Sequence, residues 1–236
     1  SSSLKIDTIP LEKGKEYPAV GNYTLAVHYQ TGWIHRVKEI RIVVKDSKAP
    51  TFTKKETNIS IAINLDGSGK SEINTGVGFF DHMLTLFAFH AGFDLTIEAK
   101  GDLEVCDHHL IEDTGILLGE LILEALGDKR GIERYGNARV PMDESLTTVD
   151  LDFSGRSYLV YHCELKRDCI GNYSTEMTKE FLQALAGNAK MTLHVNNCYG
   201  ENDHHKVESI FKALGRAMKM ATAITNQNIP STKGVL

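Results

Sequence analysis

A six-residue motif occurs twice in this chain at a fixed spacing, and it constrains the fold more than any other feature. Residues 107–112 are DHHLIE and residues 203–208 are DHHKVE, so each copy has two adjacent histidines followed by a glutamate. A Leu-Gly pair follows each copy at the same distance, at Leu118-Gly119 and at Leu214-Gly215. The offset is 96 residues in every case (204 − 108, 215 − 119). Such a repeat indicates that one structural unit has been duplicated.

The predicted elements fit two related halves, at about residues 53–140 and 141–236. Helical spacing of apolar residues, strand alternation and closing glycines predict the order of helices and strands. In the first half we expect strands within 58–76, a helix over 78–92, a strand over 93–101 and a helix over 107–127. In the second half we expect a strand over 156–165, a helix over 175–188, a strand over 191–197 and a helix over 203–224.

The Gly-rich stretch GSGK at residues 67–70 separates the first two predicted strands. A phosphate-binding P-loop would need glycine six residues before Lys70, and that position is Asn64. We therefore predict a β-hairpin over residues 58–76.

The halves also align upstream of the repeated motif, at an offset of 98 residues. HAGFDLTI (90–97) lies over NAKMTLHV (188–195), which places His82 over Glu180 (180 − 82 = 98). The same alignment places His194 over Thr96, which cannot replace it as a ligand. Glu180 is therefore the expected counterpart of His82. His194 is the competing candidate for completing the second metal site, and we expect it to support that site without binding the ion directly.

Adjacent histidines on a helix diverge by about 100°, because the helix has ~3.6 residues per turn. A histidine and a glutamate four residues apart can instead face one point, so the two histidines of each motif should serve different ions. One site would then be formed by His82, His109, His204 and Glu208, and the other by His108, Glu112, Glu180 and His205. Imidazole and carboxylate ligands suit manganese or similar divalent transition ions. A single such motif is usually a solvated helix start, but its duplication favours metal.

The composition excludes several classes of partner. The net charge of −5 argues against nucleic acid and acidic membranes, which require a basic surface. No apolar run approaches the ~18 residues of a membrane span, and the first residues lack the apolar core of a signal peptide. The four cysteines form no CxxC pair, and Cys106 is expected to be a buried, inert thiol. We expect a cytoplasmic protein.

Residues 1–52 differ from the rest of the chain. Residues 21–46 predict two strands with a turn at residues 30–32, and they resemble the last strands of a bacterial immunoglobulin-like repeat. The stretch is too short for a whole sandwich of about 100 residues. We interpret it as an appended β segment before a second domain at 53–236.

Several separate motifs in this second domain resemble imidazoleglycerol-phosphate dehydratase, a family of histidine biosynthesis. They are FFDHML, DHHLIEDTGI, GIERYG, LDFSGRSYLV, GENDHHKVESIFKA and PSTKGVL. The resemblance runs from about Thr53 to Leu236. It departs from the family at Cys106, where an acidic residue is usual, and at Glu180, where many members have histidine.

The resemblance implies the fold and the chemistry. The fold would be α+β, of the ribosomal protein S5 domain 2-like type, with duplicated half-domains whose helices pack between two four-stranded sheets. The reaction would convert D-erythro-imidazole-glycerol phosphate to imidazole-acetol phosphate and water. Two Mn²⁺ ions per active site would stabilise negative charge on the imidazole ring. The family also assembles as a homo-24-mer with sites between subunits.

The resemblance further assigns roles to residues that no local motif singles out. Glu56 would carry the proton as general base and acid. The residues expected to bind substrate, several of them through its phosphate, are His90, Arg134, Arg156, Lys212, Ser231 and Lys233.

Two other functions use parts of the same pattern. A metal-dependent hydrolase could use the same ligands, but the sequence contains no separate nucleophile motif. A secreted binding module would fit the N-terminal strands, but it would leave the duplicated ligand set without a role.

Overall fold

The computed structural model describes residues 4–6, 9–11, 21–31, 34–44, 51–54 and 56–234, with side chains described for residues 54 and 56–234. Four short or paired strands precede the main domain: β1 (Leu4–Ile6), β2 (Ile9–Leu11), β3 (Gly21–Thr31) and β4 (Ile34–Val44). β3 and β4 pair antiparallel from Gly21↔Val44 to Thr31↔Ile34, as the sequence predicts. The turn expected at residues 30–32 falls partly outside the described residues. The immunoglobulin-like resemblance stays a prediction.

Two four-stranded sheets have the same internal order. The first contains β5 (Thr51–Thr53), β6 (Thr57–Asn64), β8 (Asp94–Gly101) and β7 (Ser71–Asn74), in that spatial order. The second contains β9 (Tyr135–Met142), β10 (Ser145–Asp152), β14 (Thr192–Tyr199) and β11 (Tyr158–His162). In the first sheet β8 pairs antiparallel with β6 and parallel with β7. In the second sheet β14 pairs antiparallel with β10 and parallel with β11. The matching order confirms the duplication.

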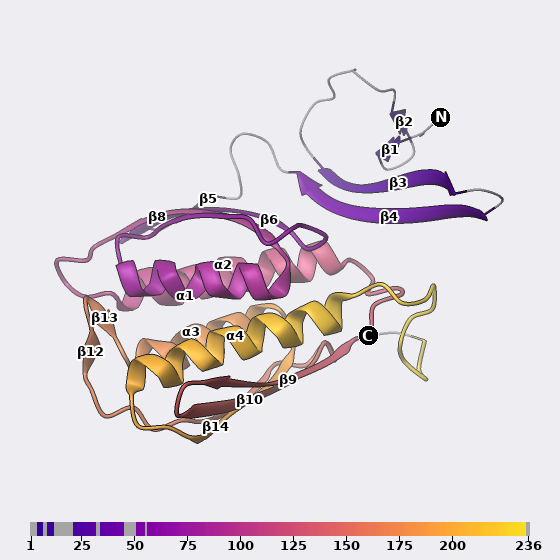
Figure 1. The fold of residues 1–236 in the computed structure, drawn as a ribbon. Coiled ribbons are helices and arrows are strands. Elements are labelled where there is room, and N and C mark those ends of the chain that lie inside the picture. Colours follow the sequence, from indigo (N-terminus) through magenta and orange to yellow (C-terminus); the bar gives the residue numbers. More distant parts are fainter. Residues whose placement is uncertain are drawn as a thin grey trace.

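Four helices lie between the two sheets (Figure 1). They are α1 (Gly78–Ala91), α2 (His108–Leu126), α3 (Met177–Asn188) and α4 (Asp203–Thr222). α1 ends where the sequence predicts, because Gly92 adopts a left-handed conformation (φ 73°) that caps the helix. β5 begins two residues before the domain boundary expected at residue 53 and pairs with β6.

The hairpin predicted over residues 58–76 is wrong. β6 and β7 do not pair with each other; β8 lies between them, antiparallel to β6 and parallel to β7. Parallel strands need a crossover connection, and α1 supplies it between β7 and β8. The Gly-rich turn is held by Asp94, whose Oδ1 accepts bonds from the backbone amides of Ser68 (2.8 Å) and Lys70 (3.0 Å).

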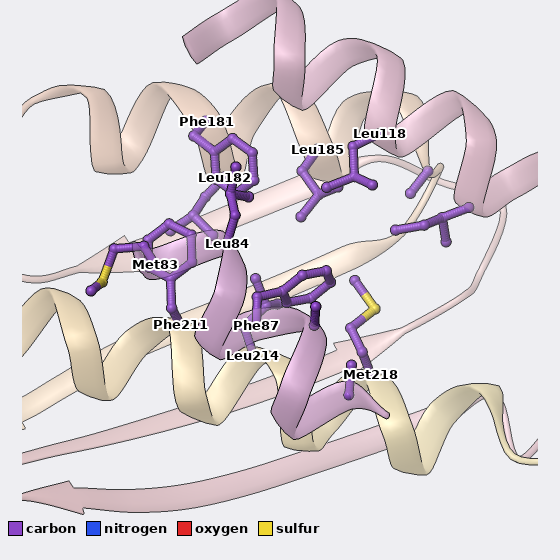
Figure 2. Close-up of a cluster of buried hydrophobic side chains, with 14 of the residues drawn as sticks. Met83, Leu84, Phe87, Leu118, Phe181, Leu182, Leu185, Phe211, Leu214 and Met218 are labelled. Atoms are coloured by element: carbon purple, nitrogen blue, oxygen red, sulfur yellow. The ribbon is translucent and has the colours of Figure 1, made fainter. Parts of the chain in front are cut away.

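The core fills the space between the helices. Figure 2 shows apolar side chains from all four helices converging, among them Phe87 of α1, Leu118 of α2, Phe181 of α3 and Phe211 of α4. Phe181 and Phe211 stack with ring centroids 5.5 Å apart. Both of these residues belong to the second half, and Phe181 also meets Phe80 of α1 edge-on with centroids 5.2 Å apart, which joins the two halves directly.

The repeated Leu-Gly pairs mark the closest helix contacts. A Cβ on Gly119 of α2 would lie 2.8 Å from Leu185 O of α3, and a Cβ on Gly215 of α4 would lie 2.7 Å from Phe87 O of α1. Only glycine permits backbones to approach this closely. The duplication therefore preserves two equivalent helix pairs, α2 with α3 and α4 with α1.

Candidate metal centre and active site

The start of α4 and the start of α1 bring three ligand-type side chains together. The metal-binding atoms of His82, His204 and Glu208 all lie within 4.8 Å of one another. Glu208 Oε2 is 3.1 Å from His204 Nε2 and 4.0 Å from His82 Nε2. Asn202 begins α4 by accepting bonds from the backbone amides of His204 and His205, which fixes the first turn. Within the part of the chain that the structure describes, this is the only such group.

Glu208 is buried beside positive charge. Burial raises the pKa of its carboxyl group, but the bond from Lys212 Nζ to Oε1 (2.6 Å) and the contact with His204 outweigh that effect. The pKa of Glu208 therefore lies below its ordinary value, and the side chain is a carboxylate, which is the form that binds metal. Lys212 itself binds Glu208 in this chain.

The first half repeats this arrangement on α2 and α3. His108 Nε2 lies 3.8 Å from Glu112 Oε2, with the two residues one helical turn apart. Glu180 lies in the first turn of α3, which packs against α2 as α1 packs against α4. The position of Glu180 therefore corresponds to that of His82, as the alignment predicts. Its role as a ligand stays a prediction.

The second histidine of each motif points elsewhere. The ring centroids of His204 and His205 are 6.0 Å apart at 84°, and those of His108 and His109 are 6.2 Å apart at 76°. A single chain brings together three of the four ligands expected for the first site, without His109. The reason is that α2 packs on α3, whereas α4 packs on α1.

Each of these second histidines has a carboxylate at Nδ1. His109 Nδ1 lies 3.1 Å from Asp102 Oδ2, and His205 Nδ1 lies 2.6 Å from Glu144 Oε2. The Glu144 bond raises the pKa of His205, and the Asn202 amide together with His205 lowers the pKa of Glu144 to about 2. A carboxylate at Nδ1 fixes the ring and directs Nε2 toward a metal ion.

His194 does not support this site within one chain, contrary to expectation. Successive side chains of a strand point to opposite faces, and Leu193 and Val195 of β14 are buried. His194 is consequently exposed on the face of the sheet that points away from the helices. Cys106 is also exposed, although the sequence led us to expect a buried thiol.

Glu56 is exposed just before β6, and two residues near it bind α2 through their side chains. Lys54 Nζ lies 2.5 Å from Asp113 Oδ1, and the Thr57 hydroxyl donates to Asp113 Oδ2 (2.7 Å). Asp113 is buried and directly follows Glu112, so the proposed proton carrier is tied to a ligand helix. Sequence reasoning missed Asp113. The available signal was an acidic residue on the apolar face of α2.

Four of the residues expected to bind substrate share one cavity. Arg134, Arg156, Ser231 and Lys233 line a cavity of about 820 Å³. Arg134 does not project freely into it, because Nε and Nη2 bind Asp152 (2.6 and 3.1 Å) and Nη1 binds Pro230 O (2.8 Å). Arg134 thus holds the C-terminal segment that carries Ser231 and Lys233.

This cavity lies far from the metal cluster within one chain. The backbone amide of Arg134 donates to Ala221 O (2.9 Å), near the end of α4. His204 and Ala221 are 17 residues apart (221 − 204), which is about 25 Å along a helix. His90 lines a separate cavity of about 1010 Å³ with Arg139, Arg216 and Lys219. Burial, and then the charges of Lys212 and Arg216, lower the pKa of His90.

Residues 75–218 match the family model described as imidazoleglycerol-phosphate dehydratase. The chain belongs to this family. It is 55% identical to the imidazoleglycerol-phosphate dehydratase of Methanosarcina barkeri (strain Fusaro / DSM 804) over 182 residues, covering 77% of this chain and 95% of the relative. It is 54% identical to that of Clostridioides difficile (strain 630), covering 77% and 94%.

Solved structures of imidazoleglycerol-phosphate dehydratases share the fold. The enzyme from Staphylococcus aureus subsp. aureus N315 matches with a TM-score of 0.67 and 46% identity, covering 74% of this chain and 98% of that one. The enzyme from Pyrococcus furiosus, in complex with (S)-C348, matches with a TM-score of 0.69 and 41% identity, covering 79% and 99%. The family and the α+β fold inferred from the sequence are confirmed. None of the helices in the described part of the chain could span a lipid bilayer.

Proposed function

We propose that this protein dehydrates D-erythro-imidazole-glycerol phosphate to imidazole-acetol phosphate in histidine biosynthesis, using two Mn²⁺ ions per active site. The observation that carries the proposal is the approach of His82, His204 and Glu208 within 4.8 Å, in the fold of a dehydratase family. Family membership also favours a lyase over the metal-dependent hydrolase that the ligands alone would allow.

The donor set fits a hard or borderline divalent ion. Two imidazoles and one charged carboxylate suit manganese and related ions, and the half-exposed His82 leaves one side accessible. His82, His204 and Glu208 would hold one ion, and His108, Glu112 and Glu180 would hold the other. When bound, Mn²⁺ supplies positive charge that stabilises negative charge on the substrate ring.

The chain's own residues supply proton transfer and phosphate binding. Glu56 gives a proton to the hydroxyl group that leaves the carbon next to the ring, and it takes a proton from the adjacent glycerol carbon, so that water is lost and the enol of the ketone product forms. Its exposure lets it reach a bound substrate, while Asp113 binds the side chains of Lys54 and Thr57 nearby. Arg156 and Lys233 bind the phosphate in the cavity that Arg134 shapes.

A second copy of the chain completes the site in this proposal. The phosphate cavity lies about 25 Å from the metal cluster along α4 of one chain, which is too far for one small substrate to span. His109 and His205 each bind a carboxylate through Nδ1, and neither belongs to the cluster of His82, His204 and Glu208 in one chain. In the proposed homo-oligomer, one subunit brings its phosphate cavity and its His109 or His205 to the metal cluster of another subunit. This arrangement accounts for both observations.

The test is product formation with metal removed and restored. Protein stripped with a chelator should form no ketone product from imidazole-glycerol phosphate, and addition of Mn²⁺ should restore it. Glu208→Gln should remain inactive with Mn²⁺. The exposed strand residue Glu98 provides the matched control, because Glu98→Gln should be fully active. Absence of a ketone product from the Mn²⁺-loaded protein would contradict the proposal.

A further inference from the structure

One segment of the chain contacts the starts of all four helices that carry proposed ligands. It comprises residues 163–176, lies between β11 and α3, and contains β12 (Cys169–Ile170) and β13 (Tyr173–Ser174); we call it the β12–β13 segment. It is closed at its base, because the Thr175 hydroxyl donates to Arg167 O (2.5 Å) and the Thr175 amide donates to Asp168 O (2.9 Å). It continues directly into α3, whose first turn carries Glu180.

The aspartate that opens the first motif binds this segment. Asp107 Oδ2 accepts a bond from the backbone amide of Ser174 (2.6 Å), and Oδ1 accepts one from the Ser174 hydroxyl (2.7 Å). Asp107 is buried and immediately precedes His108. The bonds therefore tie the start of α2 to the residues that lead into α3.

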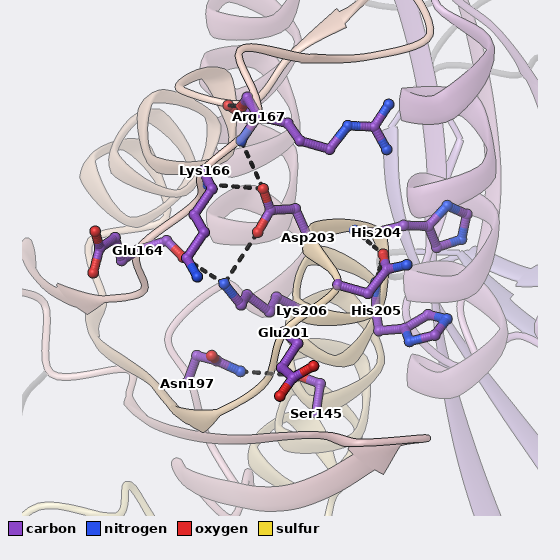
Figure 3. Close-up of polar contacts among 12 residues, drawn as sticks. Ser145, Glu164, Lys166, Arg167, Asn197, Glu201, Asp203, His204, His205 and Lys206 are labelled. Carbon is purple, nitrogen blue, oxygen red and sulfur yellow. Dashed lines mark hydrogen bonds and ion pairs between the residues drawn. The ribbon is translucent and has the colours of Figure 1, made fainter.

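The aspartate that opens the second motif binds the same segment from another side. Asp203 Oδ2 accepts bonds from the backbone amides of Lys166 and Arg167, each 2.7 Å, as Figure 3 shows. Lys206 Nζ then joins Asp203 Oδ1 (3.0 Å) to Glu164 O (2.8 Å). Asp203 and Lys206 are both buried. These bonds tie the start of α4 to the β12–β13 segment.

The start of α1 is held to the segment through aromatic packing. The buried ring of Tyr173 packs against Phe79 with centroids 5.3 Å apart, and Phe79 in turn meets the ring of His204 edge-on at 5.0 Å. Asn172 Nδ2 also donates to Gly76 O (2.9 Å), just before α1. The segment thus connects the helix that carries His82 to the other three.

Buried carboxylates are costly unless they are fully bonded, and bonds to an ionised acceptor are stronger than neutral ones. Each aspartate is also the residue before an adjacent pair of proposed ligands, so a change in its position moves those histidines. We propose that Asp107 and Asp203 are positioning residues that hold the four helix starts in register through the β12–β13 segment and thereby set metal affinity. The inference rests on the proposed metal centre.

The experiment compares Asp107→Asn and Asp203→Asn with a matched control elsewhere in the fold. Asp94→Asn is that control, because Asp94 also accepts two backbone amide bonds, from Ser68 and Lys70, in a turn that carries no proposed ligand. Two quantities are measured for each variant of the full chain. They are the Mn²⁺ dissociation constant by calorimetric titration and the unfolding temperature of the metal-free protein.

We expect Asp107→Asn and Asp203→Asn to weaken Mn²⁺ binding about 10- to 100-fold, as substitutions behind metal ligands do. Asp94→Asn should lower the unfolding temperature but leave Mn²⁺ affinity within about 2-fold of the wild type, since no outer partner of a ligand is touched. Mn²⁺ affinity that is unchanged in both motif variants would overturn the inference. Wild-type protein that binds no Mn²⁺ would overturn the metal centre as well.

A milder variant keeps the test decisive if either aspartate variant fails to fold. Ser174→Ala removes the hydroxyl donor to Asp107 Oδ1 but keeps the backbone donor to Oδ2. It should fold and show a smaller but measurable loss of Mn²⁺ affinity. Wild-type affinity in Ser174→Ala, together with a lowered unfolding temperature, would mean that the bond is only structural and would overturn the inference.

Discussion

Replacing Gly215 with alanine should separate α4 from α1 and weaken both the fold and the metal site. The new Cβ would lie 2.7 Å from Phe87 O and 3.1 Å from Ala91 N, whereas ordinary contacts begin at 3.4 Å. One helix would have to recede by about 0.7 Å (3.4 − 2.7) because backbone atoms cannot rotate away. Such overpacking costs about 2–3 kcal/mol, and the helix propensity of alanine returns about 1 kcal/mol.

The expected net loss is therefore about 1–2 kcal/mol of unfolding free energy, or roughly 2–8 °C in unfolding temperature. Thermal unfolding of the metal-free protein, followed by circular dichroism, measures it. Gly187 near the end of α3 is the matched control, because its added Cβ meets nothing within 4 Å. Gly187→Ala should be neutral or stabilising by up to about 1 kcal/mol. A Gly215→Ala protein as stable as the wild type, with unchanged Mn²⁺ affinity, would refute the close-packing argument.

Three further changes test separate parts of the site. Glu180→Ala should lower bound Mn²⁺ by about half, counted by elemental analysis; full occupancy would remove Glu180 from the ligand set. Glu56→Gln should reduce turnover by roughly 10²–10⁴-fold while Mn²⁺ binding and unfolding temperature stay at wild-type values; unchanged turnover would contradict its role in proton transfer. Burial raises the pKa of Asp94, but bonds from Ser68 and Lys70 outweigh this and place it below the ordinary value of 3.8. The ionised Asp94 therefore stabilises the fold above about pH 4, and this contribution is lost as the pH falls through the lower pKa of the folded state. The difference in unfolding free energy between the wild type and Asp94→Asn should accordingly close below about pH 4. A difference of constant size would contradict that assignment.

The helices and the approach of the proposed ligand pairs could be predicted from the sequence because both depend on local periodicity. The i, i+4 spacing of His204 and Glu208 fixes their approach once α4 forms, and Gly92 ends α1 through its own backbone conformation. The duplication then supplied Glu180 without any local signal. These inferences needed no knowledge of which elements are neighbours.

Strand neighbours and buried polar partners could not be predicted in the same way. β7 pairs with β8 rather than β6 because α1 returns the chain between them, which is a property of the tertiary fold. The hairpin of β9 and β10 was missed, although Ala138, Val140 and Met142 of β9 alternate with exposed residues; Pro141 is tolerated because β9 lies at the edge of its sheet. Asp113 bonds Thr57 from 56 residues away, and no spacing rule connects them.

The sequence predicts one active site, but the proposed phosphate cavity and the proposed metal cluster lie about 25 Å apart along α4 of one chain. This is the largest difference between the predicted and the observed site. Sequence motifs list the residues of an active site without saying which copy of the chain supplies each one. His109 is a clear example, because it belongs to the ligand set by motif but lies outside the cluster of His82, His204 and Glu208 in one chain.

The central claim is that the duplicated motif builds two equivalent metal sites, one on each ligand helix. Counting Mn²⁺ per chain by elemental analysis in the wild type, Glu112→Ala, Glu208→Ala and the double variant tests it most directly. The account predicts two ions in the wild type, one in each single variant and none in the double variant. Two ions retained in either single variant, or no Mn²⁺ in the wild type, would contradict it.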